Sequence, residues 1–239
     1  MATNFEVNGN QPESEFIDVQ DLESLVGNVW FGKSVKGRLV EAYQESTFNG
    51  KHANNKDQKY RNIQIQLEST TTPGLKVKMT VWDSAISHFK FIKPIFGEIL
   101  MFKNVKISRI EDELARNLGV VAFQLNSNAT TSSEISKVEN HALEYYTLDN
   151  IDKAQVGKVI SFRATVLEKK EQRTNLIVVK VRQREGNWHE VVFWKDKQEW
   201  TENLTFLKPR MYCSFQGIQI KANAQLTGTI YSKINIFKI

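Results

Sequence analysis

Two tryptophans, Trp82 and Trp194, each end a segment that reads as a β-strand, and an acid-containing turn follows each of them. A nearly identical tetrapeptide lies downstream of each turn, FIKP at 91–94 and FLKP at 206–209. The match indicates one module used twice. A large flat ring at the same point of two basic segments predicts a surface on which nucleic-acid bases can stack, an interaction worth roughly 1–3 kcal/mol per base.

Strand alternation predicts the direction of both rings. The apolar residues at 77, 79 and 81 alternate with polar ones, and Trp82 shares the polar register with Lys76 and Lys78. Trp194 is likewise out of register with the apolar residues at 191 and 193. Because successive side chains of a strand point to opposite faces, we expect both rings to point away from their cores. The alternative is that each ring caps its domain beneath a helix or loop.

Cations and polar side chains around the two rings are the further candidates for phosphate and base contacts. The segment 46–60 reads as a long basic loop between two strands, whereas its counterpart at 168–173 is shorter and of mixed charge. Phosphate contacts predict binding that weakens steeply with salt. The candidates are Arg38, Phe48, Lys51, Lys56, Lys59, Tyr60, Arg61, Asn62, Gln64, Lys76, Lys78, Thr80, Lys106 and Arg109 in the first half, and Lys169, Lys170, Arg173, Lys180, Arg182 and Lys221 in the second.

Both halves show the same succession of elements. Each is preceded by an aromatic residue, Phe16 or Tyr146, eleven positions before the glycine of a Val-Gly pair. The first half predicts strands over 34–43, 60–68, 75–82, 98–108 and 120–126, with a helix over 83–95. The second half predicts strands over 159–168, 176–183, 189–194, 211–221 and 227–238, with a helix over 195–207.

Three strands, a helix and two more strands are the order of the OB-fold, whose ligand groove lies on strands 2 and 3 between the strand 1–2 and 4–5 loops. We therefore predict an all-β protein of two tandem OB-folds, five-stranded Greek-key barrels with a helix between strands 3 and 4. An immunoglobulin-like sandwich would need about seven strands per half. The predicted boundaries are a disordered acidic N-terminus at 1–15, a first barrel at 16–126, a linker at 127–144 and a second barrel at 145–239.

The charge of the chain is unevenly distributed. Residues 1–25 hold six acids and no Lys or Arg, whereas 26–125 hold 15 Lys and Arg against nine acids, and 146–239 hold 16 against nine. Two basic halves suit a polyanionic partner. No secretory leader or apolar run of roughly 20 residues occurs, so we expect no membrane partner. The single cysteine, Cys213, fits a reducing compartment, and we expect the nucleus.

Motifs of known catalytic chemistry are missing from the sequence. There is no Gly-rich phosphate loop and no Gly-x-Ser-x-Gly elbow. The four histidines are scattered, and none stands at metal-ligand spacing from Cys213. We expect no enzymatic activity, no metal and no cofactor.

The segment from Tyr146 to Ile151, the Val-Val-Phe-Trp run that ends at Trp194 and the helical segment after it resemble the tandem DNA-binding OB domains of the replication protein A large subunit. Protection-of-telomeres proteins share this architecture. The resemblance implies that Trp82 and Trp194 stack on single-stranded DNA. One departure stands out: the segments 108–119 and 221–226 lack the second stacking aromatic that is usual in the replication-protein family.

The leading hypothesis is therefore a non-enzymatic single-stranded DNA-binding protein, with a role in telomere protection, replication, repair or meiosis. One alternative is an assembly module that binds other proteins through the acidic N-terminus or the second barrel. Another is a binder of single-stranded RNA, since stacking platforms accept either nucleic acid.

Overall fold

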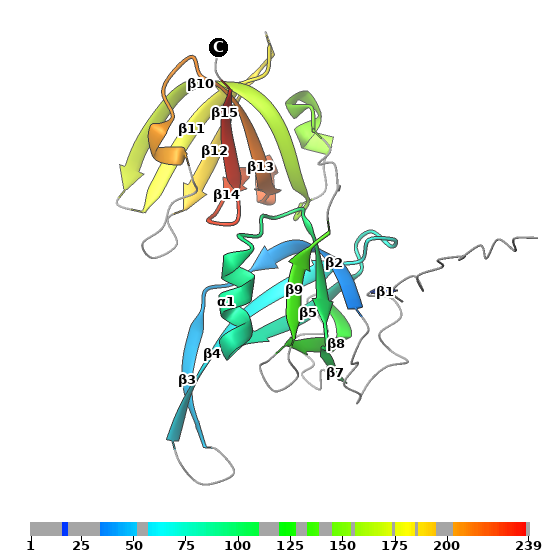
Figure 1. Cartoon of the computed structure of the whole chain (residues 1–239). Coiled ribbons are helices and arrows are strands. Elements are labelled where there is room, and N and C mark those ends of the chain that lie inside the picture. Colours follow the sequence, from blue (N-terminus) through cyan, green and yellow to red (C-terminus); the bar gives the residue numbers. More distant parts are fainter. Residues whose placement is uncertain are drawn as a thin grey trace, which may run out of the picture.

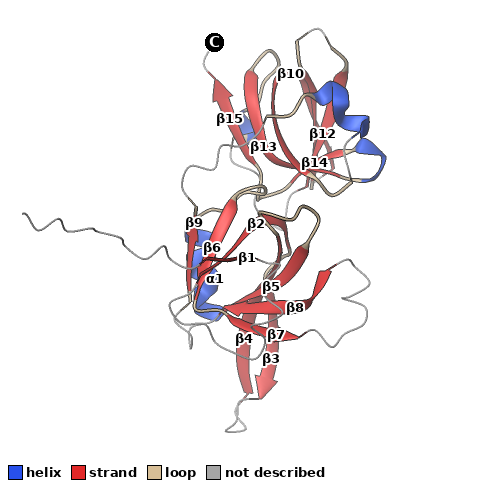
Figure 2. Cartoon of the chain, turned by 90° about the vertical axis from the view of Figure 1, so that its right-hand side faces the viewer, coloured by secondary structure: helices blue, strands red, loops and turns tan. Residues whose placement is uncertain are grey.

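A computed structural model of the 239-residue chain describes residues 16–18, 34–51, 57–109, 120–127, 133–138, 145–153, 156–173, 175–184, 186–194 and 203–237. These residues form two β-barrels that follow each other along the chain, with the second drawn above the first in Figures 1 and 2. The predicted acidic segment 1–15 lies outside the described residues. Within the described part of the chain, every helix is too short or too polar to cross a membrane.

The described residues of the first half form a five-stranded Greek-key barrel with one helix. Its sheet runs in the order β2-β4-β5-β8-β7, and β6, which leads directly into β7, pairs with β2 and brings the sheet round on itself. β5 and β8 are parallel, as strands 3 and 5 of this fold should be. The elements are β1 (Phe16–Asp18), β2 (Ser34–Ala42), β3 (Ser46–Lys51), β4 (Asp57–Glu68), β5 (Lys76–Trp82), α1 (Asp83–Phe91), β6 (Ile99–Lys103), β7 (Lys106–Arg109), β8 (Val120–Ser127) and β9 (Glu134–Lys137).

The second barrel repeats this order and is closed. Its strands follow each other as β10-β11-β12-β14-β13, and β10 pairs with β13. Both halves are thus OB-folds, as the sequence predicted. The elements are the 3-10 helix η3 (Leu148–Lys153), β10 (Val159–Arg173), β11 (Leu176–Arg182), β12 (Trp188–Trp194), η4 (Leu204–Phe206), β13 (Tyr212–Ile220), η5 (Ala222–Ala224), β14 (Leu226–Gly228) and β15 (Lys233–Phe237).

Strand alternation fixes the core of each barrel. Over residues 63–67 and 77–81 of the first barrel and 177–181 and 191–193 of the second, every second residue is apolar and no more than 1% exposed, and its neighbours on the strand face outward. A register slip of one residue would point these side chains toward solvent. Their burial therefore fixes the register of the strands. The set is Ile63, Ile65, Leu67, Val77, Met79 and Val81 in the first barrel, and Ile177, Val179, Val181, Val191 and Phe193 in the second.

The repeat includes a bend in the fourth strand. The backbone has a positive φ at Asn104 (53°) in the first barrel and at Gly217 (69°) in the second. In both barrels a buried serine donates its hydroxyl to the carbonyl at this bend, Ser133 to Asn104 and Ser232 to Gly217, each at 2.8 Å. The same polar contact therefore ties the chain after strand 5 to the bend in strand 4 in both modules.

This equivalence corrects part of the predicted linker at 127–144. β9 lies inside that segment and pairs with β6, just as β15 pairs with β13. The segment reads as a linker because its few apolar residues give a weak periodic signal, yet Ile135 reaches the core and is only 7% exposed.

Two further segments predicted as loops are strands. Residues 46–51 form β3, which pairs with the first half of β4 as a hairpin that projects from the first barrel, away from the second (Figure 1). Residues 168–173 continue β10, whose pairing with β11 extends to Arg173 and Leu176. Polar residues on both faces hide such strands from hydrophobic periodicity, because backbone pairing alone holds them.

The first predicted helix is shorter in the structure. α1 ends at Phe91 instead of at residue 95. The second predicted helix spans 195–207, but residues 195–202 lie outside the described residues and η4 covers only Leu204–Phe206.

The two barrels contact each other through backbone and side chains. The Phe96 amide donates to the Tyr231 carbonyl at 2.8 Å, and the two rings stack with centroids 5.2 Å apart. The buried Gln219 amide donates to the Val40 carbonyl. Tyr231 and Val159 of the second barrel also pack against the core of the first. The junction is therefore hydrogen-bonded and apolar.

Replacing Gly217 with alanine should destabilise this junction. A Cβ at Gly217 would lie 2.9 Å from the carbonyl oxygens of both Phe96 and Tyr231, and its φ is positive. Gly74 is a matched control, since its φ is also positive (+85°) but a Cβ at that position would meet nothing within 4 Å. We expect Gly217→Ala to lower the free energy of unfolding by about 1–3 kcal/mol more than Gly74→Ala in urea denaturation. Equal losses would contradict the close approach at the junction.

Candidate nucleic-acid interface

The outer face of β11 and β12 carries a tryptophan at each end of β12. Trp188 is 53% exposed and Trp194 is 46% exposed. They are six residues apart, so about 20 Å separates them along the strand. Both are out of register with the buried Val191 and Phe193, so both rings face outward, as alternation predicts for Trp194.

Cations from β11 lie beside Trp188. The Lys180 ammonium nitrogen is 3.5 Å from the centroid of the Trp188 ring, and Arg182 is the cross-strand partner of Trp188. Arg182 is exposed, and Lys180 is half-buried. Trp188 also lines a pocket between β12 and the strand 4–5 loop, whose walls are Ile151, His189, Glu190, Val192 and Asn223–Gln225.

Between the two tryptophans the same face is mixed, because Val178 and Val192 lie beside Glu190, an exposed acid that is the cross-strand partner of Lys180. Val178 and Val192 are cross-strand partners, only 7% and 6% exposed although they lie outside the core cluster. Leu176 pairs with Trp194 at the far end. The face therefore has a ring at each end of β12, with Lys180, Arg182 and Glu190 beside Trp188 and two nearly buried valines between the rings. The two exposed rings can stack on bases while the cations meet phosphates.

The corresponding face of the first barrel, on β4 and β5, is more polar. Trp82 is half-buried at the end of β5, with Asn62 as its cross-strand partner. Lys76 and Lys78 are half-buried and lie opposite Glu68 and Gln66. This face offers two cations and one partly exposed ring.

Two predicted base-contacting residues are not available at the surface. Asn62 is 8% exposed and Thr80 is 5% exposed, although alternation places both outward. Each is flanked on both sides, Asn62 by β3 and β5 and Thr80 by β4 and β8. A neighbouring strand on each side thus buries short polar side chains that strand alternation alone would expose. Gln64, which is longer, stays half-buried.

Tyr43 is an exposed ring of the first barrel that the sequence did not single out for this site. It is 45% exposed, and the Gln66 amide donates to its hydroxyl at 3.3 Å. Burial, with Glu41 nearby, raises the pKa of Tyr43 to about 12. The phenol therefore stays neutral and keeps its proton as a hydrogen-bond donor at physiological pH.

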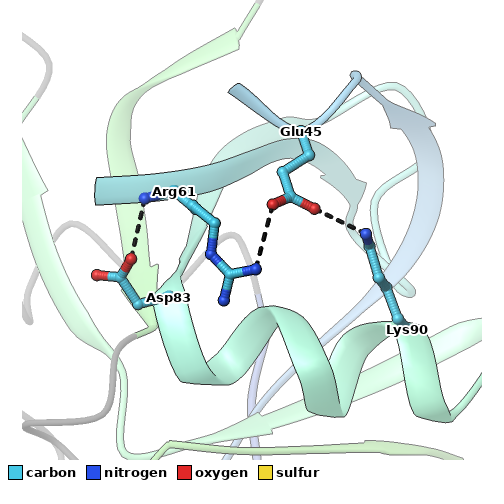
Figure 3. Close-up of polar contacts among 4 residues, drawn as sticks. All are labelled: Glu45, Arg61, Asp83 and Lys90. Atoms are coloured by element: carbon cyan, nitrogen blue, oxygen red, sulfur yellow. Dashed lines mark hydrogen bonds and ion pairs between the residues drawn. The ribbon is translucent and has the colours of Figure 1, made fainter. Parts of the chain in front are cut away.

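Other cations of the first barrel form ion pairs or hydrogen bonds within the protein. Glu45 bridges Arg61 at 3.5 Å and Lys90 of α1 at 2.7 Å, and the Arg61 amide donates to Asp83 (Figure 3). The Arg38 guanidinium donates to the Gly97 carbonyl at 2.9 Å. Arg61 and Arg38 thus have structural partners, which weakens the case that they meet phosphates.

The remaining candidates are scattered. Lys59 is exposed on the β3–β4 hairpin, Tyr60 is half-buried there, and Lys106 is exposed on β7. Lys56 lies outside the described residues, as do the side chains of Phe48, Lys51, Arg109 and Arg173. In the second barrel Lys169 donates to the Thr205 carbonyl, Lys170 pairs with Glu168, and Lys221 precedes η5 beside the pocket.

Trp188 could have been found from the sequence. The predicted strand began at residue 189, one position too late, because a Gly-Asn turn precedes Trp188. Extending the alternation of Glu190, Val192 and Trp194 back by two residues places Trp188 on the same face. It supplies the second barrel with the second ring that the strand 4–5 loop lacks.

Solved structures share this fold. The chain aligns with a replication protein A heterotrimer bound to single-stranded DNA at a TM-score of 0.52 and 10% identity, over 88% of this chain and 49% of that chain. It therefore spans about half of that chain, and the likeness concerns the fold alone.

Weaker matches include the tetrameric p202 HIN2 structure, at a TM-score of 0.38 and 12% identity over 88% of this chain and 96% of that chain. Fission yeast Pot1 with single-stranded DNA matches at a TM-score of 0.34 and 9% identity over 86% and 83%. These scores are too low to carry an argument. No protein-family model and no curated protein matches the sequence.

Lys180 and Trp188 should be energetically coupled. A cation over an exposed indole is worth about 0.5–1 kcal/mol. A double-mutant cycle of Lys180→Met and Trp188→Leu, followed by urea denaturation, should return a coupling of this size. The same cycle with Lys170→Met is the control and should return none, because Lys170 pairs with Glu168. A coupling no larger than that of the control would contradict the observed contact.

Proposed function

We propose that this protein is a non-enzymatic binder of single-stranded nucleic acid, with DNA favoured over RNA. The single observation that carries the proposal is the outer face of β12, where two exposed tryptophans face outward and Lys180 lies over one of the rings. Strands 2 and 3 are where OB-folds bind oligonucleotides. The likeness in fold to a replication protein A structure with single-stranded DNA supports the same reading.

The proposal extends to the setting in which the protein works. A nuclear role in genome maintenance (telomere protection, replication, repair or meiosis) fits the two basic halves and the resemblance to replication and telomere proteins. The missing catalytic and metal-binding motifs favour a binding role without cofactor. The resemblance to single-stranded DNA-binding proteins favours DNA, whereas stacking platforms by themselves accept RNA as well.

An assembly module is the second candidate, because OB-folds also bind proteins. Exposed aromatics on the other side of the second barrel, Tyr145 and Tyr212, are 43% and 40% exposed and favour a protein contact there. The two functions are compatible, since they use different faces.

Oligonucleotide binding tests the proposal. We expect labelled oligodeoxythymidine to bind the full chain, with an affinity that falls as salt rises because phosphate contacts release counterions; about four contacts would give a log–log slope of about −3. Trp188→Ala and Trp194→Ala should each weaken binding by about 5- to 150-fold, the equivalent of roughly 1–3 kcal/mol. Fluorescence anisotropy over a salt series measures both effects.

Tyr212→Ala is the matched control, because it removes an exposed ring from the other side of the same barrel and should leave the affinity unchanged. Oligouridine and duplex DNA in the same assay test the preference for DNA and for single strands. If no oligonucleotide binds at low salt, the nucleic-acid function is wrong and the assembly module stands.

A further inference from the structure

The side of the second barrel formed by β10, β13 and β15 carries a cluster of three rings around one arginine. The Arg163 guanidinium lies 4.4 Å from the Tyr145 ring centroid and 5.4 Å from that of Phe237. Tyr212 packs against Phe237 with centroids 5.6 Å apart. We call Tyr145, Arg163, Tyr212 and Phe237 the aromatic–arginine cluster.

The cluster is ordered and yet open to solvent. Tyr145 is 43% exposed, Tyr212 is 40% exposed, Arg163 is exposed and Phe237 is half-buried. The Gln216 amide donates to the Tyr145 hydroxyl at 3.2 Å, and hydrogen bonds of this kind, Arg163 included, lower the pKa of Tyr145 against the opposing effect of burial. Because its rings are already held in place, a partner would lose little side-chain entropy on binding them.

The face around the cluster is positive. Its outward positions hold the cations Arg163 and Lys233, with uncharged side chains at the other positions. Among the ion pairs of the described residues, none involves Arg163 or Lys233. The uncharged outward positions are Tyr145, Ser161, Thr165, Tyr212, Ser214, Gln216, Asn235 and Phe237.

The first barrel has only part of this cluster at the equivalent positions, because the pairing of Phe16 with Ser34 corresponds to that of Tyr145 with Ser161 and places an aromatic residue where Tyr145 stands. The matching strand pairs place Lys36 where Arg163 stands, Ile99 where Tyr212 stands and Val138 where Phe237 stands. Closing an OB-fold therefore does not require rings at the positions of Tyr212 and Phe237. The presence of these two rings in the second barrel indicates a role other than folding.

The composition of the cluster points to a protein partner. Tyrosine and arginine are enriched at the centres of protein interfaces, where they provide large rigid contact areas. A guanidinium presents its donors in a fork that matches a carboxylate, and stacking on rings leaves the edge of that fork directed outward. Two cations are few for tracking a phosphate backbone, which carries a charge at every nucleotide.

We propose that the aromatic–arginine cluster docks an acidic peptide segment of a partner protein, one with an aromatic or aliphatic side chain beside a carboxylate. The carboxylate pairs with Arg163, and the apolar side chain packs on the Tyr212 and Phe237 rings. The cluster lies on β10, β13 and β15, whereas the candidate nucleic-acid interface lies on β11 and β12. The proposal therefore holds whether or not the protein binds nucleic acid.

Binding of labelled peptides to the full chain tests this docking site. A fluorescein-labelled peptide of alternating glutamate and phenylalanine should bind at low ionic strength, and the glutamine–phenylalanine version should bind at least about tenfold more weakly, because a lost charge-assisted hydrogen bond costs about 1.5 kcal/mol or more. Arg163→Ala should weaken the binding of the acidic peptide by a similar factor. Tyr145→Phe keeps the ring over Arg163 and should change the affinity much less.

Lys36→Ala and Trp188→Ala are the controls, the first at the equivalent position of the first barrel and the second on the other face, and both should leave peptide affinity unchanged. Thermal melts identify any variant that fails to fold. In that case the comparison of the acidic and neutral peptides on the wild-type chain still tests the proposal. Failure of the acidic peptide to bind, equal binding of the neutral peptide, or an unchanged affinity of folded Arg163→Ala would each overturn the proposal. An oligonucleotide that needs Arg163 and displaces the peptide would instead assign the cluster to nucleic acid.

Discussion

Burial of alternate residues on strands 2 and 3 is the constraint on which every surface of this protein depends. Ile65 and Met79 in one barrel, and Val179 and Val191 in the other, are completely buried. Because their neighbours must then point outward, the cores themselves decide where Trp82, Trp188 and Trp194 stand. Loss of a ring should therefore affect binding far more than stability, whereas a register shift would remove the whole face at once.

The contacts between the barrels extend this constraint from each single core to the pair of barrels. Tyr231 of the second barrel belongs to the packing of the first, and Gly217 serves two purposes, the bend of the fourth strand and the close approach of Phe96. The second barrel thereby closes one end of the first. The two barrels are therefore joined by a specific contact.

Sequence patterns predicted most of the fold, because alternation and the repeat are strong wherever a core is buried. They failed where apolar residues are too few to give a periodic signal, as in β3, in β9 with its one buried residue Ile135, and in the far end of β10. For the site, alternation placed Trp194 correctly but missed Trp188 behind a turn, and it could not foresee that flanking strands bury Asn62 and Thr80. The aromatic–arginine cluster joins positions 145, 163, 212 and 237, which only the three-dimensional pairing brings together.

Photo-crosslinking of the full chain to single-stranded DNA that contains 5-iododeoxyuridine, with the adducts mapped by mass spectrometry, tests the central claim most directly. If bases stack on the outer face of β12, adducts should form at Trp188 and Trp194 and should disappear when unlabelled oligodeoxythymidine competes. Adducts confined to Tyr145, Tyr212 and Phe237, or none that competitor removes, would contradict the account.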